Sequence, residues 1–231
     1  MEAQEAGAVQ KGEGKGEEEE VEVEVGRGVK VVVGRAQHLE EAGSGRCMTG
    51  AWMWDSALLL AEWLVSAAQA DELQMTHTTR VIELGAGCTG LPGLTAALLG
   101  AGEVVLTDRP GQLLAVLQAN VSANGLDERR VQVKGLEWGQ EAEAEAFDVV
   151  LMSDVLYDVE SVAALCRCIR RVSGPHSLIV MAYEQRLITD ECLALLPLHG
   201  LLFAELPRPS LPPRWRHPDD PGILTIWSAP V

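Results

Sequence analysis

Long apolar runs and targeting signals are missing from this sequence of 231 residues. Although apolar residues make up 47% of the chain, no run approaches the ~20 uninterrupted apolar residues that a membrane span requires. The first residues are acidic and rich in glycine, so they resemble neither a secretory signal nor an Arg-rich transit peptide. We therefore expect no membrane association, and a location in the cytoplasm with or without the nucleus.

Cysteine is too scarce and too scattered to form a disulfide framework. The sequence has an odd number of cysteines, at positions Cys47, Cys88, Cys166, Cys168 and Cys192. The closest pair, Cys166 and Cys168, lacks both the C-x-x-C spacing and the nearby histidines of a zinc site. We interpret the cysteines as buried structural thiols and predict no metal site.

Basic residues are outnumbered, with 18 Lys and Arg against 34 Asp and Glu and a net charge of −16. Because an acidic surface repels phosphate backbones and no compensating basic cluster occurs, we expect no nucleic-acid partner. A basic segment of another protein is electrostatically an easier partner. The acidic surface, with no spare apolar helix face, favours a monomer.

The chain is long enough for one well-buried domain. Residues 1–20 combine glutamate with glycine and have few apolar side chains, so they are interpreted as a disordered acidic tail before a single domain at 21–231. Alternating valines around Gly26-Arg27-Gly28 predict a β-hairpin at 21–33, outside the main fold. Apolar residues at helical spacing then predict a helix from Asp55, capped by Asp55 or Ser56.

Beyond this helix, strand-like and helix-like segments alternate. Strands are predicted at 80–84, 103–107, 131–136, 147–152, 177–182, 201–205 and 223–227. Helices are predicted at 91–99, 111–123, 159–172 and 190–196. Such alternation is typical of right-handed crossovers in a parallel sheet covered on both faces. The last two strands have no helix between them and should pair antiparallel. The predicted fold class is α/β, a Rossmann-like, mostly parallel sheet of seven strands with an antiparallel terminal hairpin.

A glycine-rich turn joins the strand at 80–84 to the following helix. Gly85, Gly87 and Gly90 permit a sharp turn and the close approach of a ligand to the backbone. Asp108 ends the next strand 23 residues after Gly85, close to the ~20 residues expected of an acid that binds a ribose. This spacing fits a dinucleotide such as NAD as well as another nucleoside cofactor, and the alternative is a turn that binds nothing.

Three features favour S-adenosylmethionine over NAD. Glu83 lies two residues before the first glycine, where its carboxylate can serve the positively charged end of the cofactor. Trp138 follows the third strand, where adenine is expected in an open α/β sheet. No second dinucleotide-binding half follows in the remaining chain. The sequence therefore predicts an S-adenosylmethionine-dependent methyltransferase.

Several motifs together resemble family 16 of the seven-β-strand methyltransferases, over about residues 20–230. The resemblance is carried by the segments 81–93, 106–108 and 136–139, and above all by Ser153-Asp154-Val155-Leu156-Tyr157, in which Asp154 and Tyr157 match a D-x-x-Y motif. That family consists largely of protein-lysine methyltransferases. The resemblance thus implies methyl transfer to a lysine of another, non-histone protein.

Two branches of the methyltransferase-like 21 type share further motifs with this chain. Tyr183-Glu184-Gln185-Arg186 resembles the branch that methylates valosin-containing protein, an AAA ATPase. The segments 99–101, 107–109 and 138–140 resemble the branch that acts on Hsp70 chaperones. An AAA ATPase or an Hsp70-type chaperone is therefore the implied partner.

The resemblance also implies which residues form the site. Contacts to the cofactor are expected from Trp54, Gly85, Ala86, Gly87, Asp108, Trp138 and Ser153. Asp154 is expected to orient the incoming ammonium before it loses its proton, and Tyr157 to line a narrow channel. The family usually has G-x-G-x-G, whereas Cys88-Thr89 places an extra residue before Gly90. The turn must therefore bulge or shift.

Other functions fit the same scaffold. The acceptor can instead be arginine, histidine or a small molecule, or the protein can be a catalytically silent partner that binds the cofactor. The proline-rich segment 207–218 is expected at the rim of the site, either reading a protein substrate or idle. Trp52 is interpreted as a core residue.

Overall fold

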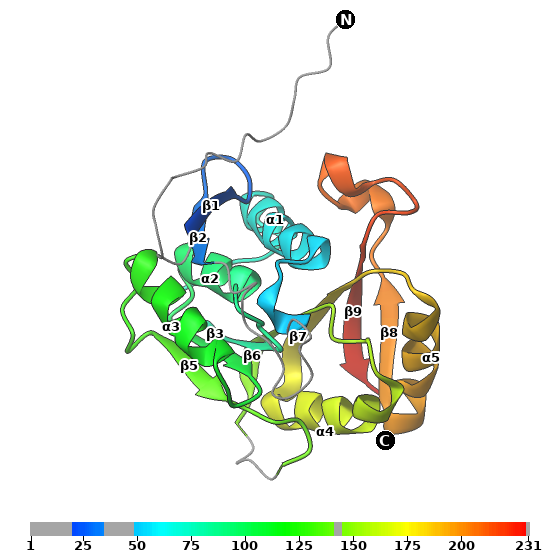
Figure 1. The fold of residues 1–231 in the computed structure, drawn as a ribbon. Coiled ribbons are helices and arrows are strands. Elements are labelled where there is room, and N and C mark those ends of the chain that lie inside the picture. Colours follow the sequence, from blue (N-terminus) through cyan, green and yellow to red (C-terminus); the bar gives the residue numbers. More distant parts are fainter. Residues whose placement is uncertain (1–19, 35–48, 141–144, 230–231) are drawn as a thin grey trace, which may run out of the picture.

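A central sheet lies between two layers of helices in the computed structural model, which describes residues 20–34, 49–140 and 145–229 (Figure 1). The expected tail at 1–20 falls outside these residues except for Glu20. Within the described ranges, no helix is long and apolar enough to cross a membrane.

The central sheet has seven strands in the order β5-β4-β3-β6-β7-β9-β8. Their bounds are β3 (Arg80–Leu84), β4 (Glu103–Asp108), β5 (Val131–Gly135), β6 (Phe147–Ser153), β7 (Ser173–Tyr183), β8 (Leu201–Glu205) and β9 (Gly222–Ser228). The five strands β5, β4, β3, β6 and β7 pair parallel, whereas β9 pairs antiparallel with both β7 and β8. This topology confirms the predicted fold class. The direction in which successive strands are added to the sheet reverses between β3 and β6.

Helices cover both faces of the sheet because successive residues of a strand point to opposite sides. One face packs against α1 (Asp55–Gln69), α2 (Leu91–Leu98) and α3 (Leu113–Ala123), and the other against α4 (Val162–Val172) and α5 (Leu187–Leu195) (Figure 1). Along β3, for example, Val81 belongs to the first core cluster and Ile82 to the second. Strands buried on both sides explain the near-continuous apolar runs of the sequence.

The hairpin of β1 (Glu20–Glu24) and β2 (Lys30–Gly34) is confirmed as a separate two-stranded sheet. It is not detached from the core, because its alternate valines are buried in the same cluster as α1 and α2. Two asparagine side chains, one in α3 and one at its C-cap, also bind the backbone of the hairpin. The Asn124 side chain pairs with both the N–H and the C=O of Val32 (2.8 and 2.7 Å), and Oδ1 of Asn120 accepts the Gly34 N–H (2.7 Å).

Some predicted boundaries are wrong. The strand β7 begins at Ser173 instead of 177, because Ser173 pairs with Phe147 across an irregularity in β6. The helix α5 begins at Leu187 instead of 190, and Leu187 is 90% exposed, which hid the start from any apolar pattern. Neither Asp55 nor Ser56 caps α1: its N-cap is Trp54, without a side-chain hydrogen bond.

Candidate active site

A cavity of about 550 Å³ opens where β3, β4 and β6 end, next to the point where strand order reverses. Ligands of open α/β sheets bind at such a switch point, outside the carboxyl ends of the strands. The cavity brings together the predicted site residues Trp54, Gly85, Ala86, Gly87, Asp108, Trp138, Ser153, Asp154 and Tyr157.

The turn after β3 leaves no room for side chains at two of its glycines. Gly85 and Gly87 have positive φ angles of 72° and 61°. A Cβ on Gly85 would lie 2.9 Å from a methyl group of Val155 and 3.3 Å from the Trp138 ring, and one on Gly87 would lie 3.0 Å from the Gly50 carbonyl oxygen. Glycine is therefore required here both by backbone conformation and by space.

The extra residue in this turn is held by contacts from distant segments. The Cys88 N–H donates to the Gly50 carbonyl (2.6 Å), and the Asn120 side-chain amide donates to the Cys88 carbonyl (2.8 Å). Gly90 is the N-cap of α2 and has the left-handed conformation, with a φ of 55°. Cys88 and Thr89 are buried, and Cys88 packs with Ala51 and with Leu113 and Val116 of α3, so the added residue folds inward instead of bulging into solvent.

Asp108 stands at the tip of β4 with its carboxylate ordered by backbone amides. Its oxygens accept the N–H groups of Gly87 and Arg109, each at 2.8 Å. Burial raises the pKa of Asp108, while these two hydrogen bonds act in the opposite direction. Each oxygen retains a further lone pair, so the carboxylate can still accept from a sugar hydroxyl.

Glu83 does not line this cavity, which corrects the expectation that it serves the charged end of a cofactor. Its side chain is fully buried, and Oε2 accepts the N–H of Gly93 in α2 (2.8 Å). Burial raises the pKa of Glu83 to about 8. The residue therefore connects β3 to α2 beneath the turn.

Asp154 follows β6 in a strained backbone conformation and is held by an arginine. Its φ is 54°, in the left-handed region that Asp tolerates better than most residues, and its N–H donates to the Ala182 carbonyl (3.0 Å). The Arg186 guanidinium donates to both carboxylate oxygens, at 2.8 and 2.9 Å. The sequence indicated Arg186 only as part of a motif and gave no sign of this pairing.

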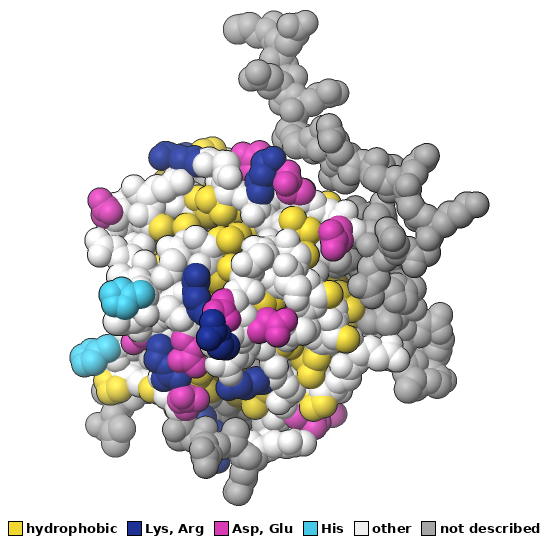
Figure 2. Space-filling view, turned by 90° about the vertical axis from the view of Figure 1, so that its left-hand side faces the viewer, with side chains coloured by type: hydrophobic (Ala, Val, Ile, Leu, Met, Phe, Trp, Pro, Cys, Tyr) yellow, Lys and Arg dark blue, Asp and Glu magenta, His cyan; other side chains and the backbone are white. Residues whose placement is uncertain are grey.

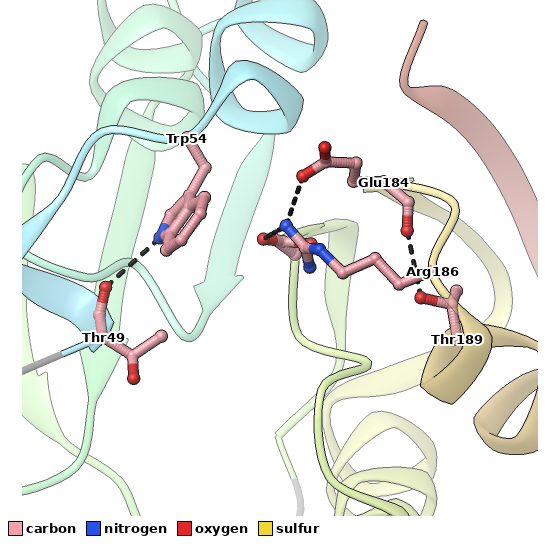
Figure 3. A network of polar contacts seen from close by, with 6 residues as sticks. Thr49, Trp54, Glu184, Arg186 and Thr189 are labelled. Carbon is pink, nitrogen blue, oxygen red and sulfur yellow. Dashed lines mark hydrogen bonds and ion pairs between the residues drawn. The ribbon is translucent and has the colours of Figure 1, made fainter. Parts of the chain in front are cut away.

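Arg186 also links Asp154 to the opposite wall of the site. It extends from the start of α5 past Glu184, with which it forms a second ion pair, toward the indole of Trp54 (Figure 3). The guanidinium carbon lies 5.4 Å from the centre of the indole ring. The Trp54 Nε1 donates to the Thr49 carbonyl (3.2 Å), which fixes the orientation of the ring.

Aromatic side chains at the cavity are more exposed than a core residue would be. Trp52 is 45% exposed and lines the cavity, so its interpretation as core is wrong. Tyr157 is exposed to the same degree, and partial shielding from water raises the pKa of its hydroxyl. Arg109 and Glu137 also line the cavity. The sequence indicated them only through their neighbours, because Arg109 follows the predicted Asp108 and Glu137 precedes the predicted Trp138.

The proline-rich segment does not stand at the cavity, because none of its residues lines it. It is instead fastened to α1 through Glu62. The Glu62 carboxylate accepts from Nε of Arg214 (2.8 Å) and from the indole N–H of Trp215 (2.6 Å), and Trp215 is buried. The segment is thus a structural part of the α1 surface.

Metal-binding residues are not grouped in the described ranges, where no set of three His, Cys, Asp or Glu side chains could hold an ion. Cys166, Cys168 and Cys192 are buried, and burial raises the pKa of each thiol. Cys47 lies outside the described residues.

The fold is that of the Rossmann-like methyltransferases. A ribosomal protein L11 methylase from Lactobacillus delbrueckii subsp. bulgaricus matches with a TM-score of 0.60 and 14% identity, over 90% of this chain and 99% of that one. The glycopeptide N-methyltransferase MtfA, solved with S-adenosylmethionine, matches with a TM-score of 0.56 and 14% identity, over 73% and 94% of the two chains.

Sequence comparison identifies the family of methyltransferases to which the chain belongs. Residues 36–193 match the family described as lysine methyltransferase, and the chain belongs to this family. In Xenopus tropicalis, "EEF1A lysine methyltransferase 3" is 36% identical over 58% of this chain, and "Protein N-lysine methyltransferase METTL21A" is 37% identical over 64%. The matched regions span 57% and 66% of the lengths of these two relatives.

Proposed function

We propose that this protein transfers a methyl group from S-adenosylmethionine to a lysine side chain of another protein. The observation that carries the proposal is the single cavity in which a glycine turn, Asp108 and Trp138 meet Asp154 and Tyr157. Membership of the lysine methyltransferase family supports it.

The residues of the cavity fit the cofactor. The bare backbone of Gly85 and Gly87 permits close approach, the carboxylate of Asp108 can accept from ribose hydroxyls, and the ring of Trp138 offers a flat apolar surface for adenine. When bound, S-adenosylmethionine would supply a methyl group carried by a positively charged sulfur. As the lone pair of an acceptor nitrogen forms the new N–C bond, the S–C bond breaks and the sulfur is left as a neutral thioether.

The task left to the protein is alignment and exclusion of water. Correct positioning can supply ~7–11 kcal/mol of an activation barrier. Trp52, Trp54 and Tyr157 present exposed rings around the cavity, which can flank the aliphatic part of a lysine. Asp154 lines the same cavity, and the remaining lone pairs of its carboxylate can accept a hydrogen bond from the acceptor nitrogen.

Labelling of a cell extract with tritiated S-adenosylmethionine tests the proposal. The wild type should label a protein band, with the label recovered as methyl-lysine after hydrolysis, and Asp154→Asn should lose at least about tenfold of this activity, because a tenfold loss needs only ~1.4 kcal/mol. Asparagine is the suitable replacement, since it tolerates the positive φ of this position. Asp127→Asn, at an exposed site paired with Arg129, is the matched control.

The outcomes separate the alternatives. Label in arginine, histidine or the small-molecule fraction would replace lysine as the acceptor. Binding of S-adenosylmethionine in a calorimetric titration without labelling of any fraction would indicate a silent interaction protein. Purified EEF1A, an Hsp70 chaperone and the AAA ATPase valosin-containing protein are the acceptors to assay first, the first because of the relative named for it.

A further inference from the structure

Arg186 neutralises Asp154 from outside the cavity. Asp154 and Trp54 line the cavity, whereas Arg186 and Glu184 do not. The guanidinium gives one N–H to each carboxylate oxygen of Asp154, in the two-pronged geometry that only arginine provides. The Asp154 side chain is only 9% exposed. The charge of Asp154 beside the cavity is therefore offset by the Arg186 guanidinium, which Glu184 shares.

This balance matters because only a neutral amine has the lone pair needed to attack. An unpaired carboxylate beside the acceptor would favour the ammonium form and raise the pKa of the lysine. A carboxylate paired with arginine still has lone pairs to orient an amine N–H, but it no longer favours the extra proton.

We propose that Arg186 is a positioning residue that cancels the charge of Asp154, so that the site holds its acceptor lysine as a neutral amine. The inference rests on the proposed function and concerns the protonation state of the acceptor, which that function leaves open. The proton of the incoming ammonium passes to water before the acceptor nitrogen is enclosed.

The other charges around Asp154 also influence the pKa of the acceptor lysine. Glu184 binds the same guanidinium from the loop after β7. The remaining ionisable groups that line the cavity are Asp108, Arg109, Glu137, Tyr157 and Asp158. The hydrogen bond from Arg186 to Asp154 raises the pKa of the guanidinium further, so it stays charged at every pH of an assay. Loss of Arg186 would leave both Asp154 and Glu184 without this partner.

The test is the pH dependence of kcat for Arg186→Gln, measured at saturating acceptor protein, because kcat reports protonation states in the enzyme–substrate complex. Initial rates are measured on the extract protein that the wild type labels, from about pH 6 to about pH 10, below the ordinary lysine pKa of ~10.4. The rate of the variant should rise with pH along a curve displaced upward by about one pH unit, so that its deficit is about tenfold at low pH and shrinks at high pH. Arg186→Lys should keep the position of the curve.

Controls distinguish a charge effect from damage to the fold. Arg129→Gln removes one cation at a site that is 91% exposed and should leave the curve in place. Calorimetric affinity for S-adenosylmethionine and the thermal midpoint are measured for each variant. A deficit of Arg186→Gln that is equal at all pH values would overturn the inference while the proposed function stands. If the wild type labels no protein lysine, the proposed function fails, and this inference with it.

Discussion

Glu83 is a carboxyl group buried where the protein provides it with one partner instead of several. Oε2 accepts the Gly93 N–H, while Oε1 is buried without a hydrogen bond. Burial raises the pKa to about 8 from an ordinary value of 4.5. The folded protein therefore keeps this group protonated at neutral pH, when the unfolded chain ionises it. The contribution of Glu83 to the free energy of unfolding is therefore fully present below about pH 4.5 and declines as the pH rises to about 8.

Replacement of Glu83 by glutamine should remove that decline. Near pH 8, the free energy of unfolding of Glu83→Gln should exceed that of the wild type by a few kcal/mol, because each pH unit of the window contributes ~1.4 kcal/mol. The two free energies should converge near pH 5. Urea unfolding at several pH values measures this. Because Gln also offers an acceptor to Gly93, the comparison changes the ionisation and little else; parallel curves for the two proteins would refute the explanation.

Residues at strand ends could be predicted from the sequence because a local pattern marks them. Asp108, Trp138 and Asp154 follow apolar strands, and parallel strands bring their ends together. The exposed position of Trp52 and the pairing of Arg186 with Asp154 depend on contacts between distant segments, which no local pattern records. Glu83 shows the opposite error, because a residue beside the turn can point under it instead of into the cavity.

At the scale of elements, Asn120 joins three parts of the fold. From α3 its carbonyl accepts the Gly34 N–H at the end of β2, and its amide donates to the Cys88 carbonyl in the glycine turn. Asn120 is 2% exposed, so loss of its side chain would remove two hydrogen bonds at a site that water does not reach. The hairpin and the cofactor turn are thus positioned by one side chain.

Asn120→Ala should therefore weaken both folding and cofactor binding. We expect a loss of ~1–3 kcal/mol in the free energy of unfolding for each buried hydrogen bond removed, together with a lower affinity for S-adenosylmethionine. Asn124→Ala is the matched control, since it removes the bonds to Val32 and to the Asn120 backbone carbonyl but leaves the Asn120 side chain on the turn. It should destabilise the protein and keep the affinity. Equal affinities for the two variants would show that the turn does not depend on Asn120.

At the scale of the whole molecule, acidic side chains outnumber basic ones, and the two kinds are interspersed. On the face shown in Figure 2, basic and acidic side chains lie next to one another instead of forming one basic patch. The chain as a whole carries a net charge of −16. Such a surface attracts basic segments over distances of a Debye length, ~10 Å at 0.1 M salt.

Methyl transfer to a basic acceptor segment should consequently depend on salt. Raising the salt concentration from about 0.05 M to about 0.5 M should lower kcat/KM by about tenfold through slower association, with kcat changed little. Initial rates on the labelled extract protein at both concentrations measure this, and the cofactor affinity measured in the same buffers serves as the control. A rate that is insensitive to salt would mean that the acceptor segment is not basic.

The order of strands in the sheet has a consequence for how the chain is made. β9 is the last strand of the described chain, yet it lies between β7 and β8. On the ribosome, β3, β4 and the glycine turn can assemble while β7 still has an open edge, which invites pairing with other chains. The Asp154 N–H donates to Ala182 of β7, and Ala182 pairs with Ile223 of β9. The half of the site proposed to receive the acceptor is therefore completed last, after the half proposed to hold the cofactor.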